Sequence, residues 1–478
     1  MYGGFGGRAN SALFFGVVGL LAATPALSAD LGGDCCSDLE ERIAELEATT
    51  ARKGNRKVSL TVSGWVNEAV FWWDDGTEKN VYVGTNMIEQ SRFRFTGEAK
   101  IDKDWSAGYI LEIGLQGAPS NQWNQLSPNS SNLNPSNQNN SLLVRKSNWF
   151  IKSKTYGQIA VGQNGTATYH LLDDADPLLT RNVNDAEGAA IYLSQFFLRS
   201  GGQFIQGGDG FPLRWTDALR GFNNSTPGDD GRRNVVRYDT PTFHGFTGIV
   251  AWGEDDIWDT ALTFKDDIGD FLISARGGYG ESTDPGSQIG SANPVSTGVP
   301  TSYVVGGTTC ISSSTTSASA GHFVCKWGGA AATIQHKPTG LFLYGGWGWQ
   351  SVHVDDNVQT TTRLAGANDS TVWFLQPGIE RKWCSLGKTN IFGEYRHDDA
   401  GANPGKTIGA SINFWQAGIV QNIEAADTSL YLVYEHADGY ILGNKQTQGN
   451  TPGVGFAPNG RTDLDAFQTV ITGAKINF

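Results

Sequence analysis

The stretch Ser91–Ile101 reads SRFRFTGEAKI, and from Arg92 onwards polar, mostly charged side chains alternate with apolar ones and a glycine. Successive side chains of a β-strand point to opposite faces, so the alternation predicts a strand with two different faces. The charged face comprises Arg92, Arg94, Glu98 and Lys100, and the apolar face comprises Phe93, Phe95, Ala99 and Ile101. The packed interior of a soluble β-sandwich would exclude these charges. A water-filled barrel could hold them, with the phenylalanines against lipid.

The composition of the chain allows a membrane barrel and argues against a bundle of spanning helices. The chain has 478 residues, with 48 acidic and 35 basic side chains and a net charge of −13. Its mean hydropathy is −0.30. Beyond the N-terminus there is no apolar run of about 18 residues, the length that a membrane-spanning helix needs. Barrel strands alternate, so they average to moderate hydropathy.

The N-terminus has the features of a secretory signal peptide, which we predict over residues 1–29. One basic residue, Arg8, precedes an apolar core over 12–23, and small residues lead up to Ala29. Cleavage there would remove one basic residue and leave a net charge of −13 − 1 = −14. An acidic chain points towards cations as solutes, but the net charge of a whole chain reports poorly on a local constriction, so the sequence leaves ion selectivity open. We predict that residues 30–56 form a periplasmic segment with an amphipathic helix. This helix would pack on the barrel rim or form a short coiled coil on a threefold axis.

From Lys57 to Phe478 the period of the pattern is two, which predicts an all-β, 16-stranded antiparallel transmembrane barrel over 57–478. The predicted strands are 58–73, 88–101, 105–115, 142–153, 156–163, 233–240, 245–253, 257–265, 271–280, 326–337, 340–351, 370–382, 386–397, 407–422, 427–440 and 465–478. Their connections alternate between short and long, as in barrels with short periplasmic turns and longer external loops. An even strand count then places both termini on the periplasmic side.

The chain has five cysteines, and export to an oxidising compartment favours their pairing. Cys310 and Cys325 fall in one predicted external loop, and we favour a disulfide between them. Cys384 falls in a short turn on the same side as Cys35 and Cys36. A bridge from that turn to the N-terminal segment fits this arrangement, and the remaining cysteine would be free or shared between subunits.

The C-terminal stretch ends in an aromatic residue that suits the rim of a membrane barrel. In VITGAKINF the alternation predicts that Val470, Ile476 and Phe478 face lipid, while Ile471 and Lys475 face inward. Phe478 would then lie in an aromatic girdle at the periplasmic rim. The last strand must also pair with the first, because an open edge is not tolerated in lipid.

Two stretches resemble the trimeric general porins of the bacterial outer membrane, most closely the alphaproteobacterial porin family. They are VRKSNWFIKSKTYGQIAVGQN (144–164) and RNVVRYDTPTFHGFTGIVAWG (233–253). The resemblance implies a homotrimer and a long loop, here about 164–232, that folds inward and narrows the pore. It also implies that Phe478 belongs to a recognition signal for the barrel-insertion machinery. The dicysteine Cys35-Cys36 and its helix depart from this family pattern.

If this loop narrows the pore, its acidic residues would face basic residues of the barrel wall across the constriction. The expected constriction residues are Asp173, Asp174, Asp176, Asp185 and Glu187 on the loop, and Arg92, Arg94, Arg237, Arg276 and Arg396 on the wall. Opposed charges would create a transverse field that orients polar solutes and disfavours apolar ones. The carboxylates could instead be solvated or cap short helices, and the arginines could pair with Glu98 or Asp239. For Arg145, Lys146 and Lys152 the alternation does not decide whether the side chain faces the lumen or the lipid.

The sequence therefore predicts a passive, water-filled channel for small hydrophilic solutes and ions, which selects by size and by this field. The alternatives are a substrate-selective channel for sugars or anions, an outer-membrane hydrolase, and a secreted β-rich binding protein. No G-x-S-x-G, H-E-x-x-H or Walker A motif supports an enzyme. The expected partners are outer-membrane lipid and lipopolysaccharide, small solutes and the insertion machinery. We expect no nucleic acid, cofactor or metal.

Overall fold

The structure is a computed structural model, and all of the residues it describes belong to one compact unit, Lys53–Phe478. It describes residues 58–115, 117–126, 142–184, 186, 192–193, 195–207, 212–219, 226–253, 257–283, 303–305, 308–311, 323–354, 369–401, 407, 409–443 and 460–478. The predicted signal peptide and N-terminal helix lie outside these residues and stay predictions.

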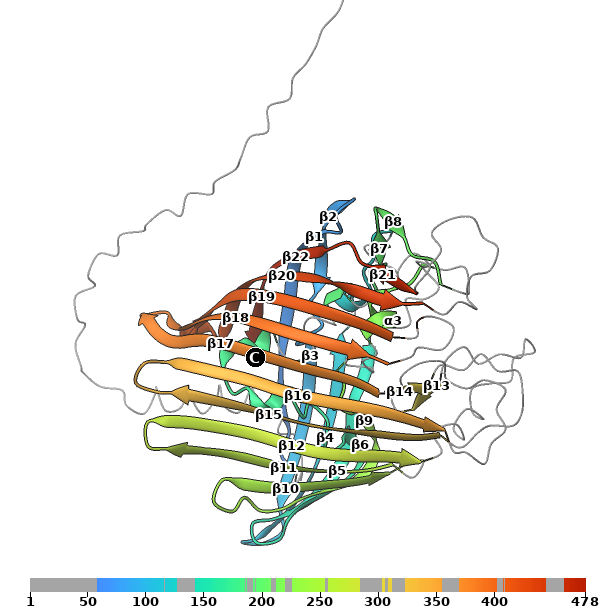
Figure 1. The fold of residues 1–478 in the computed structure, drawn as a ribbon. Helices are drawn as coiled ribbons and strands as arrows, with labels where there is room; N and C mark the ends of the chain where they lie inside the picture. The colour runs from blue at the N-terminus through green and yellow to red at the C-terminus, as the bar shows by residue number, and fades with distance from the viewer. Residues whose placement is uncertain are drawn as a thin grey trace, which may run out of the picture. The chain divides into compact units, whose positions relative to one another are not determined.

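Sixteen antiparallel strands form a closed barrel, as the sequence predicts. In order around the wall they are β1 (Thr61–Asp74), β3 (Arg92–Lys100), β4 (Trp105–Leu115), β5 (Leu142–Ser153), β6 (Gly157–Gly165), β9 (Arg232–Asp239), β10 (Phe246–Gly253), β11 (Ile257–Ile268), β12 (Phe271–Thr283), β15 (Phe323–His336), β16 (Leu341–Val354), β17 (Asp369–Cys384), β18 (Gly387–Ala400), β19 (Gly409–Ile423), β20 (Thr428–Leu442) and β22 (Phe467–Asn477). β22 pairs with β1, which closes the barrel (Figure 1).

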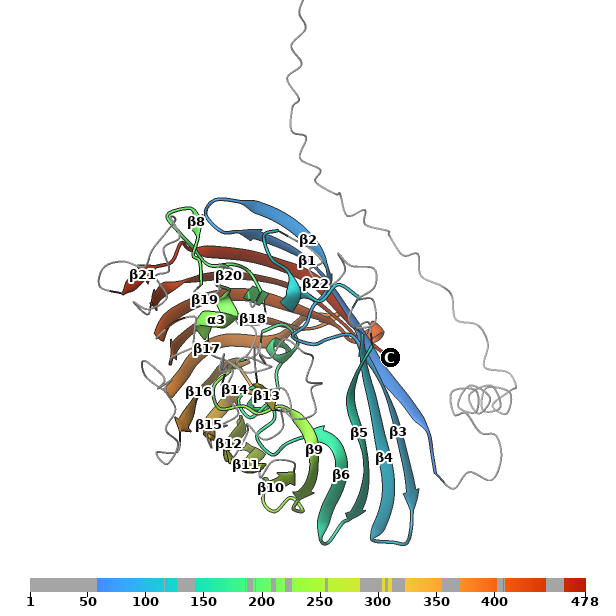
Figure 2. The ribbon, with the colours of Figure 1, turned by 90° about the vertical axis from the view of Figure 1, so that its right-hand side faces the viewer.

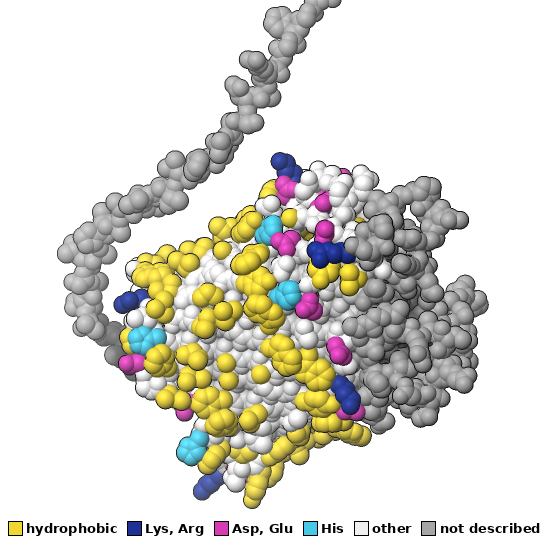
Figure 3. Space-filling view, in the orientation of Figure 1, with side chains coloured by type: hydrophobic (Ala, Val, Ile, Leu, Met, Phe, Trp, Pro, Cys, Tyr) yellow, Lys and Arg dark blue, Asp and Glu magenta, His cyan; other side chains and the backbone are white. Residues whose placement is uncertain are grey.

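Apolar side chains cover the outer surface of the strands, as Figure 3 shows on one face. They include the exposed Trp149, Trp252, Leu262, Trp347 and Trp415. Their neighbours in sequence point inward, where the charges lie. On β3, Arg92 is buried and contacts Glu112 across the inner face. The predicted division into an apolar exterior and a charged interior is therefore confirmed.

The two ends of the barrel differ in their connections. Short hairpin turns join β3 to β4, β5 to β6, β11 to β12, β15 to β16 and β17 to β18. In Figure 1 the last three of these turns lie at the left of the barrel. The long connections, including 166–231 and 284–322, join strands at the other end. This segregation follows the pattern that the sequence predicts.

Several short elements lie outside the predicted strand set. β2 (Lys79–Thr85) pairs with the C-terminal half of β1, and β21 (Arg461–Asp463) pairs with β20. The others are β7 (Arg199–Ser200), β8 (Gln203–Phe204), β13 (Tyr303–Val305), β14 (Thr308–Ile311), η1 (Ser120–Gln122), η3 (Asp173–Ala175), η4 (Leu179–Asn182), η6 (Glu424–Ala426) and α3 (Trp215–Leu219). The predicted strand 88–101 starts only at Arg92, because residues 86–91 form a connection from β2. Among the described residues, no helix is long and apolar enough to cross a membrane.

An aromatic cluster fills the inside of the barrel on the side of β1 and β18–β22. Phe71 packs edge-on against Trp123 with ring centres 5.3 Å apart, and Phe196 packs against Phe467 at 4.9 Å. Trp215 of α3 contacts Phe467 at 6.2 Å. Each of these rings is almost fully buried, so this side of the interior is a packed apolar core.

The C-terminal strand has the two faces that its sequence predicts. Ile476 and Phe478 are exposed on the outside, and Ile471 and Lys475 are buried inside. The backbone of Phe478 exchanges two hydrogen bonds with Gly64, each 3.0 Å long, so the last residue pairs directly with the first strand.

Candidate functional site

Part of the described chain between β6 and β9 lies against the inner wall of the barrel. Figure 2 shows the short elements after β6, α3 among them, inside the curve of the strands. We call residues 166–184 the interior segment. At its start, the carboxylate of Asp259 accepts hydrogen bonds from the backbone of Ala167 (3.0 Å) and Thr168 (2.7 Å). Further on, the Tyr344 hydroxyl donates to the carbonyl oxygen of Leu172 (2.9 Å).

Glycines on three neighbouring strands let the interior segment approach the wall closely. A Cβ at Gly278 or Gly329 would lie about 3 Å from the leucine side chains of the segment, Leu171 and Leu172 respectively. A Cβ at Gly348 would overlap the backbone carbonyl of Pro227, in the return of the chain towards β9. Bare backbone at these positions therefore forms the surface on which the segment rests.

Carboxylates of β17 and β18 hold the far part of the interior segment. The backbone N–H of Leu179 donates to Glu380 Oε2 (2.8 Å), and Asn184 Nδ2 donates to Glu394 Oε2 (3.1 Å) and Gln376 Oε1 (3.1 Å). We call the inner faces of β12 and β15–β19 the docked wall. β12, β15, β18 and β19 contact η3, η4 or α3, and β16 and β17 bind the interior segment through Tyr344 and Glu380.

Five basic side chains form the inner face opposite the docked contacts, and we call them the cationic wall. They are Arg92 and Arg94 of β3, Arg145 and Lys146 of β5, and Arg232 of β9. A single carboxylate, Glu112 of β4, contacts three of them. It pairs with Arg94, with Arg145 (2.8 Å) and with Arg92 (3.5 Å), and only 1 % of its side chain is exposed.

A β-bulge brings two consecutive basic residues into the interior. The pairing of β4 with β5 shifts by one residue between Glu112 and Ile113, so that Lys146 and Val144 are the paired residues of β5. Arg145, between them, pairs with Glu112, while Lys146 lies 5.9 Å from the ring centre of Tyr169. Bulges re-aim side chains in this way, and this one explains why simple alternation left both residues unassigned.

Tyr169 of the interior segment meets the cationic wall. Its hydroxyl accepts a hydrogen bond from Arg232 Nη1 (2.5 Å), and the Arg232 guanidinium lies 5.3 Å from the ring centre. Within the described residues, neither Lys146 nor Arg232 forms an ion pair. The cationic wall therefore carries positive charge that its own carboxylate does not neutralise.

The predicted acidic residues have different environments. Asp174 is accessible, with 46 % of its side chain exposed, and it pairs with Arg276 and with Arg181 (3.5 Å). Partial burial opposes its ionisation, but His170, Arg181 and Arg276 together lower the pKa of Asp174. Asp173 and Asp176 are buried within the segment. Asp185 and Glu187 lie outside the described residues.

Of the predicted basic residues, only Arg92 and Arg94 belong to the cationic wall. Arg237 pairs with Asp239 (2.7 Å), which is the alternative that the sequence analysis gave for the wall arginines. Arg276 binds Asp174 on the other side of the interior. Arg396 is fully buried, binds Asp398 and contacts the carbonyl oxygen of Ala186.

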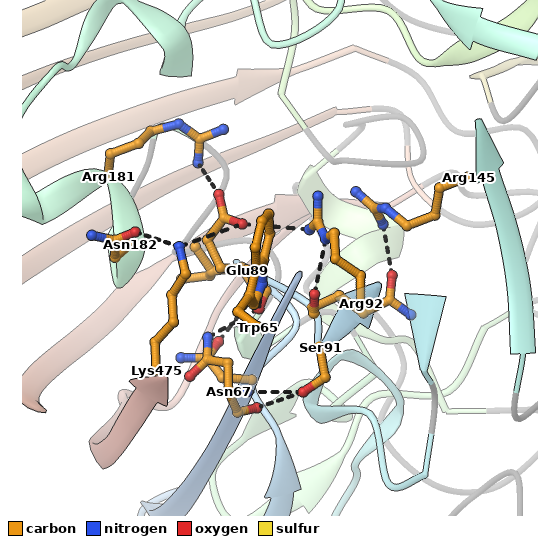
Figure 4. A network of polar contacts seen from close by, with 12 residues as sticks. Trp65, Asn67, Glu89, Ser91, Arg92, Arg145, Arg181, Asn182 and Lys475 are labelled. Atoms are coloured by element: carbon orange, nitrogen blue, oxygen red, sulfur yellow. Dashed lines mark hydrogen bonds and ion pairs between the residues drawn. The ribbon is translucent and has the colours of Figure 1, made fainter. Parts of the chain in front are cut away.

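A second polar cluster surrounds Glu89, which the sequence placed inside a predicted strand. Its carboxylate lies near Arg92, Arg181 and Lys475, from three separate parts of the chain (Figure 4). Together with Arg145, Lys146 and Arg232, Glu89 is a polar residue that sequence reasoning missed. The only hint in the sequence concerned Arg145 and Lys146, because the alternation over 142–153 did not settle which face of the strand they occupy.

The described residues hold no group of three or more His, Cys, Asp or Glu side chains that could bind a metal ion. Cys384 is free and exposed, so the structure does not have the predicted bridge from its turn to the N-terminal segment. Cys325 is buried and disulfide-bonded, but the side chain of Cys310 is not among those described. The predicted Cys310–Cys325 pair stays a prediction.

A closed antiparallel barrel with an apolar exterior and a charged interior defines a channel protein of the outer membrane. A family model described as Gram-negative porin matches residues 16–440, so the chain belongs to the Gram-negative porin family. The chain is therefore a passive diffusion channel of the outer membrane, which confirms the predicted class, function and location. Family and fold indicate a channel rather than an enzyme.

Several solved porin structures are similar to this chain. An anion-selective porin from Comamonas acidovorans has a TM-score of 0.53 and 14 % identity, over 88 % of this chain and 100 % of that chain. OmpF of Salmonella typhi, in a complex with daunomycin, has a TM-score of 0.48 and 13 % identity, over 89 % and 99 % of the two chains. At such identity, the likeness to the first shows the fold alone. A comparison with curated protein sequences gives no match.

Proposed function

We propose that solutes pass between the interior segment and the cationic wall, and that this passage is the narrowest part of the channel. The interior segment is fixed to the docked wall by Asp259, Tyr344 and Glu380, which supports its role as the constriction loop. Two accessible side chains carry opposite charges: Asp174 on the segment, which is 46 % exposed, and Arg94 on the wall, which is 36 % exposed. They would produce the transverse field that the sequence predicts.

We further propose that the channel prefers anions, and the observation that carries this is the excess of positive charge on the cationic wall. Glu112 contacts three of its five cations, and Lys146 and Arg232 have no ion pair within the described residues. Rings of basic side chains favour anions in pores. The net charge of −13 belongs to the whole chain and reports poorly on a local passage. The similar fold of an anion-selective porin is compatible with this preference.

The remaining expectations stay part of the proposal. The channel would be a homotrimer, as the family resemblance implies, with both termini and the short turns in the periplasm. Outer-membrane lipid and lipopolysaccharide would surround it, and Phe478 would serve as the signal for the insertion machinery. The signal peptide would direct export of the chain, and the N-terminal segment 30–56 would lie at the periplasmic rim of the barrel.

Ion selectivity in planar bilayers tests this proposal directly. The purified protein should give stepwise conductance, and in a potassium chloride gradient its reversal potential should have the sign of chloride preference. A cation-selective reversal potential would overturn the assignment of the cationic wall. Heat-modifiable migration on a gel shows that the barrel is folded. If protein that passes this check gave no conductance, the proposed passage between the interior segment and the cationic wall would be wrong.

A further inference from the structure

Glu89 joins three separate parts of the chain inside the barrel. It lies in the connection between β2 and β3, and 13 % of its side chain is exposed. Its carboxylate oxygens lie 3.5 Å from Arg92 Nη2, 3.4 Å from Arg181 Nη1 and 4.0 Å from Lys475 Nζ. Arg92 belongs to the cationic wall, Arg181 to the interior segment, and Lys475 to the last strand (Figure 4).

The cations around Glu89 are also held by contacts that do not involve its charge. The guanidinium of Arg92 and the ammonium group of Lys475 each lie 4.4 Å from the ring centre of Trp65, within cation–π distance. Trp65 Nε1 and Asn67 Nδ2 donate to the backbone carbonyl of Glu89, each at 3.1 Å, which fixes this connection to β1. A neutral side chain at position 89 would therefore leave Arg92 and Lys475 in place without their counter-charge.

The interior segment is attached at both ends of η4. On one side, Glu380 of β17 accepts the backbone N–H of Leu179. On the other side, Arg181 pairs with Glu89, and Lys475 Nζ donates to Asn182 Oδ1 (2.6 Å). The segment thus bridges from β17 to β22 and to the connection between β2 and β3, and Glu89 supplies the charge that binds it at the second end.

We propose that Glu89 is a specificity-determining residue of the channel: it binds Arg181 to the wall and offsets part of the positive charge at this corner of the passage. The inference rests on the proposed function. Glu89 offsets one unit of the positive charge that Arg92, Arg181 and Lys475 bring to this corner. Without it, the passage would gain one unit of net positive charge here, although Arg181 would keep its contact with Asp174.

The test compares Glu89→Gln with wild type in planar bilayers under a potassium chloride gradient. The substitution keeps the size of the side chain and removes its charge. We expect the permeability ratio of chloride to potassium to rise by about two- to threefold, as one unit of charge is lost beside the passage. The matched control is Glu98→Gln, which removes the same charge from an exposed glutamate of β3, and it should change the ratio less.

A second variant keeps the inference testable if Glu89→Gln does not fold. Arg181→Gln should change the ratio in the opposite direction, and the double variant Glu89→Gln/Arg181→Gln should lie near wild type. Heat-modifiable gel migration establishes that each barrel has folded. Wild-type selectivity in both single variants would overturn the role of Glu89 while leaving the channel itself intact. A wild-type protein that does not conduct would instead overturn the proposed function.

Discussion

The docked wall and the cationic wall face each other inside one barrel, yet they use charge in opposite ways. On the docked wall, Glu380 and Glu394 accept hydrogen bonds from the interior segment, and Asp259 does the same on neighbouring β11. On the cationic wall, Lys146 and Arg232 contact the ring and hydroxyl of Tyr169. Negative charge holds the segment in place, and positive charge is left beside the passage.

This difference shows why net charge misleads for such a chain. Carboxylates outnumber basic side chains over the whole sequence, 48 to 35. Several of the interior carboxylates are buried and accept hydrogen bonds from backbone and amide groups, because buried polar atoms need hydrogen-bond partners. Glu112, the carboxylate of the cationic wall, is itself buried beneath three arginines. The charge that a solute meets is therefore set by which carboxylates are buried.

The largest effect is expected from displacing the interior segment from the docked wall. In Gly348→Ala the new Cβ would overlap the carbonyl oxygen of Pro227, so the chain must move away from β16. Overpacking of this kind costs about 1–3 kcal/mol, and we expect lower thermal stability together with altered single-channel conductance. Gly277→Ala is the matched control, because a Cβ there meets only ordinary contacts at 3.6 Å or more. Equal behaviour of the two variants would contradict the close packing at Gly348.

The next largest effect is expected from reversing charge on the cationic wall. The double variant Lys146→Glu/Arg232→Glu introduces two carboxylates in place of two cations that form no ion pair within the described residues. We expect it to lower the permeability ratio of chloride to potassium by roughly tenfold and to reverse the sign of the selectivity. Lys103→Glu/Lys154→Glu makes the same change at two exposed positions in short turns and should leave the ratio close to wild type. A smaller effect in the wall than in the turns would remove Lys146 and Arg232 from the passage.

The sequence predicts the barrel wall well, because alternation in a membrane strand is set by local contacts with lipid and water. The predicted strands 105–115 and 142–153 have the observed bounds. The prediction fails where the period breaks. The bulge at Arg145 sends adjacent residues to one side, and β2, a short strand paired only with β1 among the described strands, carries too few alternating residues to stand out.

The interior site is less predictable, because its contacts join residues far apart in the sequence. Of the five acidic residues expected at the constriction, Asp174 alone is described and accessible, and nothing in DDAD distinguishes it from its buried neighbours. Glu89 meets Arg181 and Lys475 only after the barrel has closed. Burial and pairing decide which charges reach the passage, and neither is a local property of the sequence.

A smaller effect is expected from the accessible carboxylate of the interior segment. Asp174→Asn should raise the chloride-to-potassium ratio by about twofold, because one exposed negative charge opposite the cationic wall is lost. Asp173→Asn removes a buried group bound to His170 (2.7 Å), and it should affect stability more than selectivity. Reversal potentials and thermal unfolding of both variants separate these outcomes. If Asp173→Asn changed the ratio as much as Asp174→Asn, burial would not be the deciding property.

The smallest effect is expected from mild acid, which should not neutralise Glu89. Burial alone would raise the pKa of Glu89, but Arg92, Lys475 and Arg181 lower it to about 2 from the ordinary 4.5. Its contribution to stability is therefore fully present above about pH 4.5 and is lost as the pH falls through about 2. Glu89 should therefore cause no change in the reversal potential of wild type between about pH 7 and pH 5. The difference in unfolding free energy between wild type and Glu89→Gln should shrink only below about pH 4.5. A wild-type ratio that rises to that of Glu89→Gln already at about pH 5 would mean that the three cations do not hold this carboxylate in its charged form.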